Sequence, residues 1–133
     1  MLHLPITGLY AGLLAILFIA HSFNVIRMRL KFRVGIGVGD KNQKPLAKMV
    51  RIHGNFAEYI PLALILLAIT ELNGLGVIWL HLSGATLFIG RILHAMGLNK
   101  SIGTSKPRQI GMLSCFVVIL TLAVINICYF VFL

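Results

Sequence analysis

The sequence predicts an all-α integral membrane protein, a bundle of four membrane-spanning helices that forms one domain over residues 1–133. Its composition gives the first reason. Hydrophobic residues make up 59% of the chain and charged residues only 11%, and a soluble domain of this size could not cover so much apolar surface. The second reason is that the cations are confined to a few short segments, which leave four long apolar stretches between them.

Each apolar stretch is long enough to cross a bilayer, which takes about 20 residues in an α-helix. The predicted spans cover approximately residues 4–26, 48–72, 75–98 and 110–133. Pro5 is tolerated in a first helical turn. Pro61 lies inside the second span and should kink it beside Glu58, because it leaves the carbonyl of Ala57 without a donor. A short turn at residues 71–74 joins the second and third spans as an antiparallel hairpin.

The positive charges predict the orientation in the membrane. All twelve Lys and Arg residues lie within residues 27–48, at Arg51, or within residues 91–108. This is the positive-inside pattern, so both basic connections should face the cytoplasm and both termini the outer side. The same pattern argues against the nucleic-acid binding that a net charge of +9 could suggest, and it favours membrane lipids as partners. Cys115 and Cys128 would lie about 20 Å apart on one helix and cannot pair.

The second span carries three polar side chains at bilayer depth. Arg51, Asn55 and Glu58 are spaced i, i+4 and i+7, so they share one face of a helix. A charge at this depth costs several kcal/mol unless it finds a partner or water. We therefore expect Glu58 to find a counter-charge in Arg91 or Arg51.

Other cations lie at a similar depth on the remaining spans. Arg91 and His94 are spaced i, i+3 near the end of the third span, and Arg108 begins the fourth. With Arg27 or Arg29 from the first span, four arginines could converge on one cytoplasmic-side pocket. An excess of guanidinium groups, with amide and imidazole donors, suits a small molecule that bears carboxylates.

Two other interpretations of these residues remain. The first is purely structural: a buried ion pair between Glu58 and Arg91 holds the helices together while the other cations reach lipid head groups. The second is a metal site, which would need His53, His94 and Glu58. His53 lies off the face that carries Glu58, and the sequence has no Glu-x-x-His repeat, so no metal site is predicted.

The polar residues of the second and third spans resemble a known family pattern. Arg51, Asn55, Glu58 and Pro61 match the family of membrane-associated proteins in eicosanoid and glutathione metabolism (MAPEG), and the string at residues 58–62 is especially close. Further matches are Arg91, His94, Gly97 and Arg108. The resemblance extends over nearly the whole chain and is strongest to the small bacterial members.

This resemblance implies a homotrimer in the bacterial inner membrane, with glutathione bound between neighbouring subunits on the cytoplasmic side. It implies a glutathione-dependent transferase or peroxidase, in which a thiolate attacks a hydrophobic electrophile or reduces a lipid hydroperoxide. Arg108 resembles the arginine that stabilises the thiolate, since a nearby guanidinium lowers the pKa of a thiol. The residues implied in holding glutathione or shaping its pocket are Arg27 or Arg29, Arg51, Asn55, Glu58, Arg91 and His94.

Two positions depart from the family pattern. Leu98 stands where several catalytic members carry a tyrosine that contacts glutathione, and Met112 stands where another branch has a tyrosine near the thiol. Each missing hydroxyl would cost about 1 kcal/mol of binding. These departures leave an alternative prediction open, a non-enzymatic trimeric scaffold or lipid-binding protein with the same fold.

Overall fold

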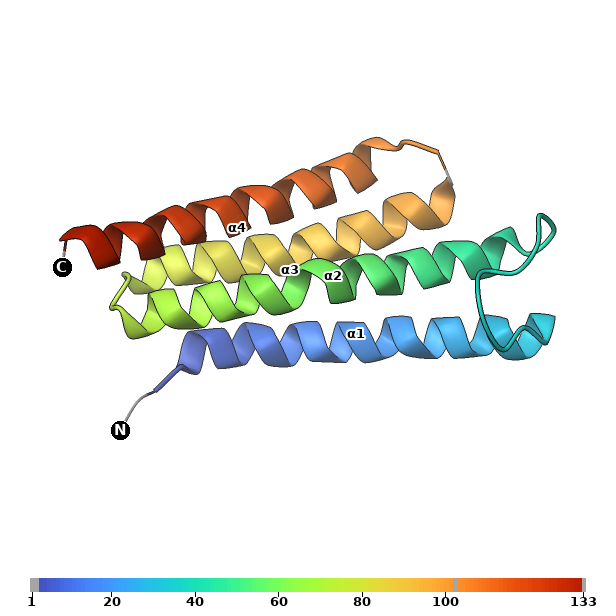
Figure 1. Ribbon diagram of the computed structural model, residues 1–133, viewed down its shortest axis with the longest axis horizontal. Coiled ribbons are helices and arrows are strands. Elements are labelled where there is room, and N and C mark those ends of the chain that lie inside the picture. Colours follow the sequence, from blue (N-terminus) through green and yellow to red (C-terminus); the bar gives the residue numbers. More distant parts are fainter. Residues whose placement is uncertain (1–2, 102, 133) are drawn as a thin grey trace.

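The protein folds as a bundle of four antiparallel α-helices, which confirms the predicted fold class. The computed structural model describes residues 3–101 and 103–132. Over these residues the elements are α1 (Pro5–Phe32), α2 (Lys44–Leu72), α3 (Val77–Lys100) and α4 (Lys106–Phe132). Each is long and apolar enough to cross a membrane. Figure 1 shows the connections from α1 to α2 and from α3 to α4 at one end of the bundle, hereafter the basic end.

All four helices extend beyond the predicted spans at the basic end. α1 continues to Phe32 and α3 to Lys100, whereas α2 already begins at Lys44 and α4 at Lys106. The predicted spans follow the apolar residues, which end at the bilayer surface. A helix can continue into the polar region until its backbone conformation changes. Arg33 caps the end of α1: its φ of 55° is left-handed, and its amide donates to the carbonyl of Arg29.

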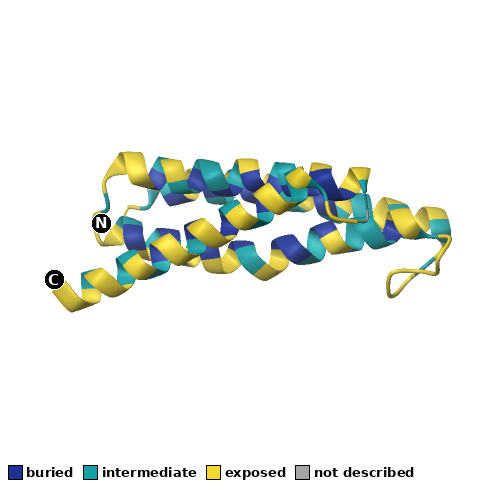
Figure 2. Ribbon diagram, turned by 90° about the horizontal axis from the view of Figure 1, so that it is seen from above, coloured by how far each residue is buried: buried dark blue, intermediate teal, exposed yellow. Residues whose placement is uncertain are grey.

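The core is built from aliphatic residues of all four helices. Leu14, Leu67, Leu87 and Leu122 each have a relative exposure of 0%. Large apolar side chains also cover the outer faces of the helices, such as Phe130, which is 90% exposed. Figure 2 shows exposed positions along the outside of every helix. An apolar exterior of this kind suits contact with lipid tails.

Glycine residues bring α3 and α4 into close contact near the basic end. A Cβ added at Gly97 would lie 2.5 Å from the backbone nitrogen of Arg108. A Cβ added at Gly111 would lie 2.7 Å from the backbone nitrogen of His94 and would overlap the carbonyl oxygen of Gly90. Small residues of this kind allow membrane helices to approach each other. The contact places the start of α4, with Arg108, directly against the end of α3.

At the opposite end, Glu71 of α2 caps the first turn of α1. Its carboxylate accepts hydrogen bonds from the backbone amides of Ile6 at 3.0 Å and Thr7 at 2.7 Å. The first amides of a helix have no partner within the helix, and a negative charge is favourable there. Glu71 therefore fixes the start of α1 against the end of α2.

Replacing Glu71 with Ala is expected to lower the free energy of unfolding by about 1 kcal/mol, the typical cost of losing a helix cap. The amides of Ile6 and Thr7 should exchange with solvent faster, which hydrogen exchange measures directly. Glu71→Gln keeps one acceptor oxygen and should lie between the two. Unchanged exchange at both amides in Glu71→Ala would show that the cap contributes nothing.

Candidate functional site

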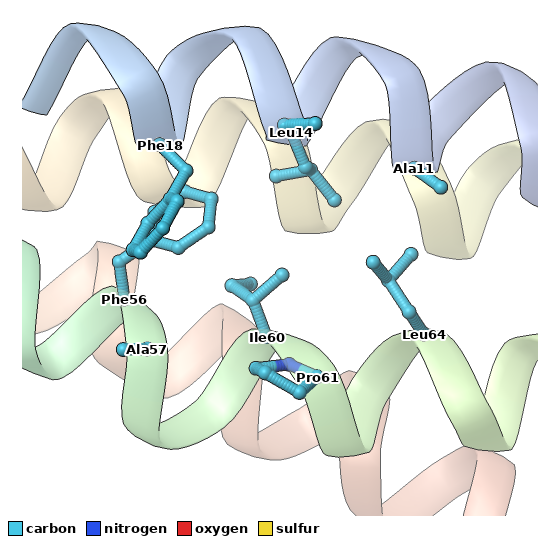
Figure 3. A pocket seen from close by; sticks show the side chains of 9 residues that line it. Ala11, Leu14, Phe18, Phe56, Ala57, Ile60, Pro61 and Leu64 are labelled. Atoms are coloured by element: carbon cyan, nitrogen blue, oxygen red, sulfur yellow. The ribbon is translucent and has the colours of Figure 1, made fainter. Parts of the chain in front are cut away.

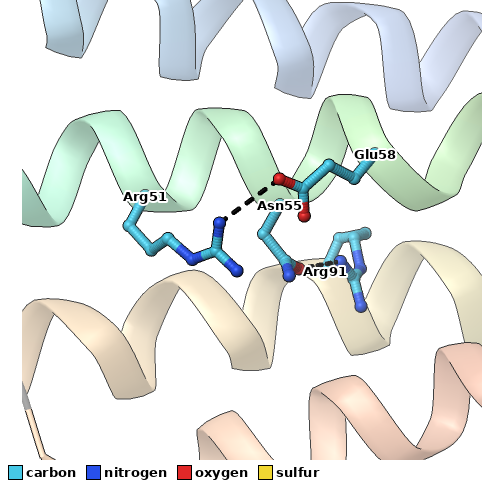
Figure 4. Close-up of polar contacts among 4 residues, drawn as sticks. All are labelled: Arg51, Asn55, Glu58 and Arg91. Atoms are coloured by element: carbon cyan, nitrogen blue, oxygen red, sulfur yellow. Dashed lines mark hydrogen bonds and ion pairs between the residues drawn. The ribbon is translucent and has the colours of Figure 1, made fainter. Parts of the chain in front are cut away.

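Arg91 is the buried centre of the polar residues at the basic end. It lies on α3 and is 1% exposed. Its Nη1 donates to Asn55 Oδ1 of α2 at 2.7 Å, and its Nη2 donates to the carbonyl oxygen of Gly111 of α4 at 3.0 Å. Figure 4 shows the bond to Asn55. One side chain thus joins three helices through neutral acceptors.

Glu58 pairs with Arg51 and not with Arg91. The distance from Arg51 Nη1 to Glu58 Oε1 is 3.3 Å, and the two side chains are 55% and 51% exposed. Figure 4 shows Asn55 between Arg51 and Glu58 along α2, with its amide turned toward Arg91. Of the two counter-charges expected for Glu58, the structure selects Arg51. The structural interpretation based on a Glu58–Arg91 ion pair is therefore wrong, because Asn55 occupies the position facing Arg91.

A cleft at the basic end is lined by basic side chains from α2 and α4. It has a volume of about 120 Å³ and lies between α2, α3 and the start of α4. The Nζ of Lys48 also donates to the carbonyl oxygen of Asn99 at 2.9 Å, and Arg108 Nη1 donates to the carbonyl oxygen of Gly103 at 3.4 Å. The cleft is lined by Ala47, Lys48, Arg51, Leu98 and Arg108.

The predicted site residues divide into three groups. Arg51 and Arg108 line the cleft, and Glu58 is joined to it through Arg51. A second group does not line the cleft and is buried among the helices. This group consists of Asn55, Arg91 and His94, which are 3%, 1% and 3% exposed.

The third group, Arg27 and Arg29, does not reach the cleft of the same protomer. Both lie in the last turns of α1, and Arg29 Nη1 donates to the carbonyl oxygen of Val34 at 3.4 Å. Figure 1 shows α1 and α4 on opposite sides of α2 and α3. The expected convergence of four arginines on one pocket is thus not found within one protomer. Sequence spacing does not indicate which helices are neighbours, and α1 packs away from α4.

One residue of the cleft, Lys48, was not predicted from the sequence as a site residue. It precedes Arg51 by three residues, a spacing that places both on one helix face, so this signal was present in the sequence. His21 of α1 is buried, and its ring packs edge-on against Phe56 with 5.9 Å between the centroids.

A separate, entirely apolar pocket lies between α1 and α2. Its volume is about 270 Å³, and Figure 3 shows Phe18 and Leu14 of α1 facing Phe56 and Ile60 of α2 across it. On α2 this pocket lies on the side that faces α1, whereas Arg51 lines the cleft next to α3 and α4. The two cavities are therefore distinct within one protomer. The apolar pocket is lined by Ala11, Leu14, Ala15, Phe18, Phe56, Ala57, Ile60, Pro61 and Leu64.

Four apolar helices with a cationic cleft at one end define a polytopic membrane protein with a polar site near one membrane surface. The chain matches the model of the MAPEG family over residues 7–128 and belongs to this family. It is similar to the inner membrane protein YecN of Escherichia coli strain K12, with 35% identity over 124 residues, which cover 93% of this chain and 92% of the relative. YecN of Escherichia coli strain O6:H1 gives the same values. The family predicted from the motif of α2 is confirmed.

Proposed function

We propose that this protein is a glutathione-dependent transferase or peroxidase of the bacterial inner membrane, with its active site facing the cytoplasm. Family membership supports a role in glutathione or eicosanoid metabolism, and the relative YecN is named an inner membrane protein. The observation that carries the proposal is the cleft in which Arg51 of α2 and Arg108 of α4 face one space. Glutathione is an anion with two carboxylates and one amino group. The cations of the cleft can bind its carboxylates, and the carboxylate of Glu58 can bind its amino group.

Each polar group of the cleft has a role in this proposal. Arg51 and Lys48 bind the carboxylates of glutathione, and Glu58 accepts a hydrogen bond from its amino group. Arg108 lies beside the sulfur and stabilises the thiolate, since an adjacent positive charge favours the charged form. The buried bonds from Arg91 to Asn55 and Gly111 hold α2 and α4 at the spacing that the cleft requires.

The chemistry follows from the thiolate. The thiol loses its proton to water, and the thiolate sulfur then bonds to an electrophilic carbon of an apolar substrate that arrives from the lipid. In a substitution the carbon releases its leaving group as an anion, and in an addition to a conjugated double bond the displaced electron pair takes a proton from water. With a lipid hydroperoxide, the thiolate instead attacks the terminal oxygen and the O–O bond breaks. Glutathione becomes a sulfenic acid, and the released lipid alkoxide takes a proton from water to give the alcohol. A second glutathione converts this product to the disulfide and water.

We also propose that the working unit is a homotrimer. The ion pair of Arg51 and Glu58 is more than half exposed on a membrane-spanning helix, and charged groups facing lipid are costly. A neighbouring copy that covers this surface would shield the pair. It would also allow Arg27 or Arg29, which do not reach the cleft of their own protomer, to complete the site of the next one.

Replacing Arg108 with Ala is expected to retain glutathione binding within a few-fold and to abolish the thiolate signal. The carboxylates are held by other cations, whereas the thiolate loses its stabilising charge. Calorimetric titration of glutathione into detergent-purified protein gives the affinity, and ultraviolet absorbance gives the thiolate. Lys106→Ala is the matched control, because Lys106 is an exposed cation on the same turn of α4 and does not line the cleft.

Thiolate formation that survives in Arg108→Ala would remove the assigned role from Arg108. A failure of the wild-type protein to bind millimolar glutathione would overturn the proposed function itself. That outcome would favour the alternative, a non-enzymatic trimeric scaffold or lipid-binding protein. One observation points in this direction. Leu98 lines the cleft with an apolar side chain, at the position where several catalytic members of the family carry a tyrosine.

A further inference from the structure

The connection between α1 and α2, residues 33–43, exposes apolar side chains at the basic end of the bundle. Ile36 is 92% exposed and Val38 is 50% exposed. They alternate with Gly35, Gly37 and Gly39, so little else surrounds them. Scattered apolar side chains on a surface need no explanation. Two exposed apolar side chains on one glycine-rich loop, with cations on both sides, form a less common pattern that calls for an explanation.

The segments on either side of this loop are strongly basic. Residues 27–48 contain seven Lys and Arg side chains, and their single acidic residue is Asp40. The Oδ1 of Asp40 accepts a hydrogen bond from the amide of Asn42 at 2.8 Å, so its carboxylate serves the local turn. Apolar side chains between clustered cations are typical of segments that bind anionic membrane surfaces.

The length of α1 places the loop at the level of the lipid head groups. Residues 5–26 contain no Lys, Arg, Asp or Glu, and at 1.5 Å per residue they span about 33 Å, close to the hydrocarbon thickness of about 30 Å. The boundary of the hydrocarbon therefore falls near Arg27. Phe32, the end of α1, lies about 7 Å further along, within the head-group layer.

The chain then turns back and does not continue away from the membrane. Arg33 adopts a left-handed conformation with a φ of 55°. The amide of Val34 donates to the carbonyl of Arg29 at 3.1 Å, and Arg29 Nη1 donates to the carbonyl of Val34 at 3.4 Å. Figure 1 shows the connection passing back beside the end of α1 before it crosses to α2. These contacts hold the beginning of the loop at the depth of the last turn of α1.

From these observations we infer that residues 33–43 form a membrane-binding loop. Ile36 and Val38 insert into the head-group layer on the basic side of the membrane, and Arg33 and Lys41 contact the phosphates of anionic phospholipids. The bilayer is the occupant that the geometry favours over a soluble partner protein, because the loop begins at head-group depth and its charge is complementary to anionic lipid. This inference is independent of the proposed function.

The test measures the depth of Ile36 in the full-length protein. An environment-sensitive fluorophore is attached to Ile36→Cys in a Cys128→Ser background, since Cys128 is exposed and Cys115 is buried. The protein is reconstituted in vesicles of phosphatidylcholine, with or without phosphatidylglycerol. Quenching is compared between lipids brominated near the head group and iodide in the water. Asn42→Cys, an exposed polar position of the same loop, is the matched control.

With anionic lipid, the probe at Ile36 should be quenched by brominated lipid and protected from iodide, whereas the probe at Asn42 should show the reverse. Replacing Arg33 and Lys41 with Gln should lower the ratio of inserted to free loop roughly thirtyfold, because each cation near an anionic surface strengthens binding about fivefold. Equal iodide quenching at both positions in anionic vesicles would overturn the inference and favour a soluble partner. Equally strong insertion in vesicles without phosphatidylglycerol would overturn the inference that the loop recognises anionic lipid.

Discussion

Replacing Asn55 with Leu is expected to lower the free energy of unfolding by about 3 kcal/mol. The substitution removes the acceptor that lies 2.7 Å from Arg91 Nη1 and leaves part of a guanidinium without a partner at a position that is 1% exposed. A buried donor that loses its partner retains its desolvation penalty, and the penalty is larger when the group is charged. Unfolding by sodium dodecyl sulfate in mixed micelles, followed by circular dichroism, measures the change.

Two further variants distinguish the loss of the hydrogen bond to Arg91 from a loss of packing at Asn55. Asn73→Leu is the control, because Asn73 is exposed and donates to Asn126 at a longer distance of 3.3 Å; it should cost far less. The double variant Asn55→Leu with Arg91→Met removes the charge together with its acceptor, so it should recover part of the loss. A double variant in which the two single losses simply add would show that Asn55 does not act through Arg91.

Replacing Gly111 with Val is expected to force α3 and α4 apart and to lower the free energy of unfolding by about 3 kcal/mol, the upper part of the range for overpacking. Any Cβ at this position would meet the carbonyl of Gly90 and the backbone of His94. Backbone atoms cannot rotate out of the way, so the helices must separate. The same movement would shift the carbonyl oxygen of Gly111 that accepts from Arg91.

Thiol labelling reports this separation independently of stability. Cys115 lies one turn after Gly111 on the same face of α4 and is 1% exposed. In a Cys128→Ser background, a small maleimide should label Cys115 much faster in Gly111→Val than in the parent. Gly8→Val is the helical control, because a Cβ at Gly8 meets nothing within 4 Å. Equal labelling rates in the two valine variants would refute close packing at Gly111.

The family motif of α2 predicted a set of candidate site residues, but it did not predict how these residues divide between a surface pair and a buried contact. Arg51, Asn55 and Glu58 were expected on one face, and the spacing supports this. In the structure the long side chains of Arg51 and Glu58 pair on the exposed side, and the shorter Asn55 turns inward to Arg91. Side-chain length and the position of α3 decide this division, and neither is contained in the spacing along one helix.

The sequence by itself determined the four membrane-spanning helices, the position of the cations at one end of the bundle, and the family. These properties depend on hydropathy and on residue identity, which are read along a single segment. Only the tertiary structure decided that Glu71 of α2 caps the start of α1 and that Arg108 and Arg51 line one cleft. It also decided that α1, the helix that carries Arg27, lies on the opposite side of α2 and α3 from α4. The physical reason is that partner choice depends on how the helices are rotated and spaced. In this protein, backbone contacts at glycines such as Gly97 and Gly111 set the spacing of α3 and α4.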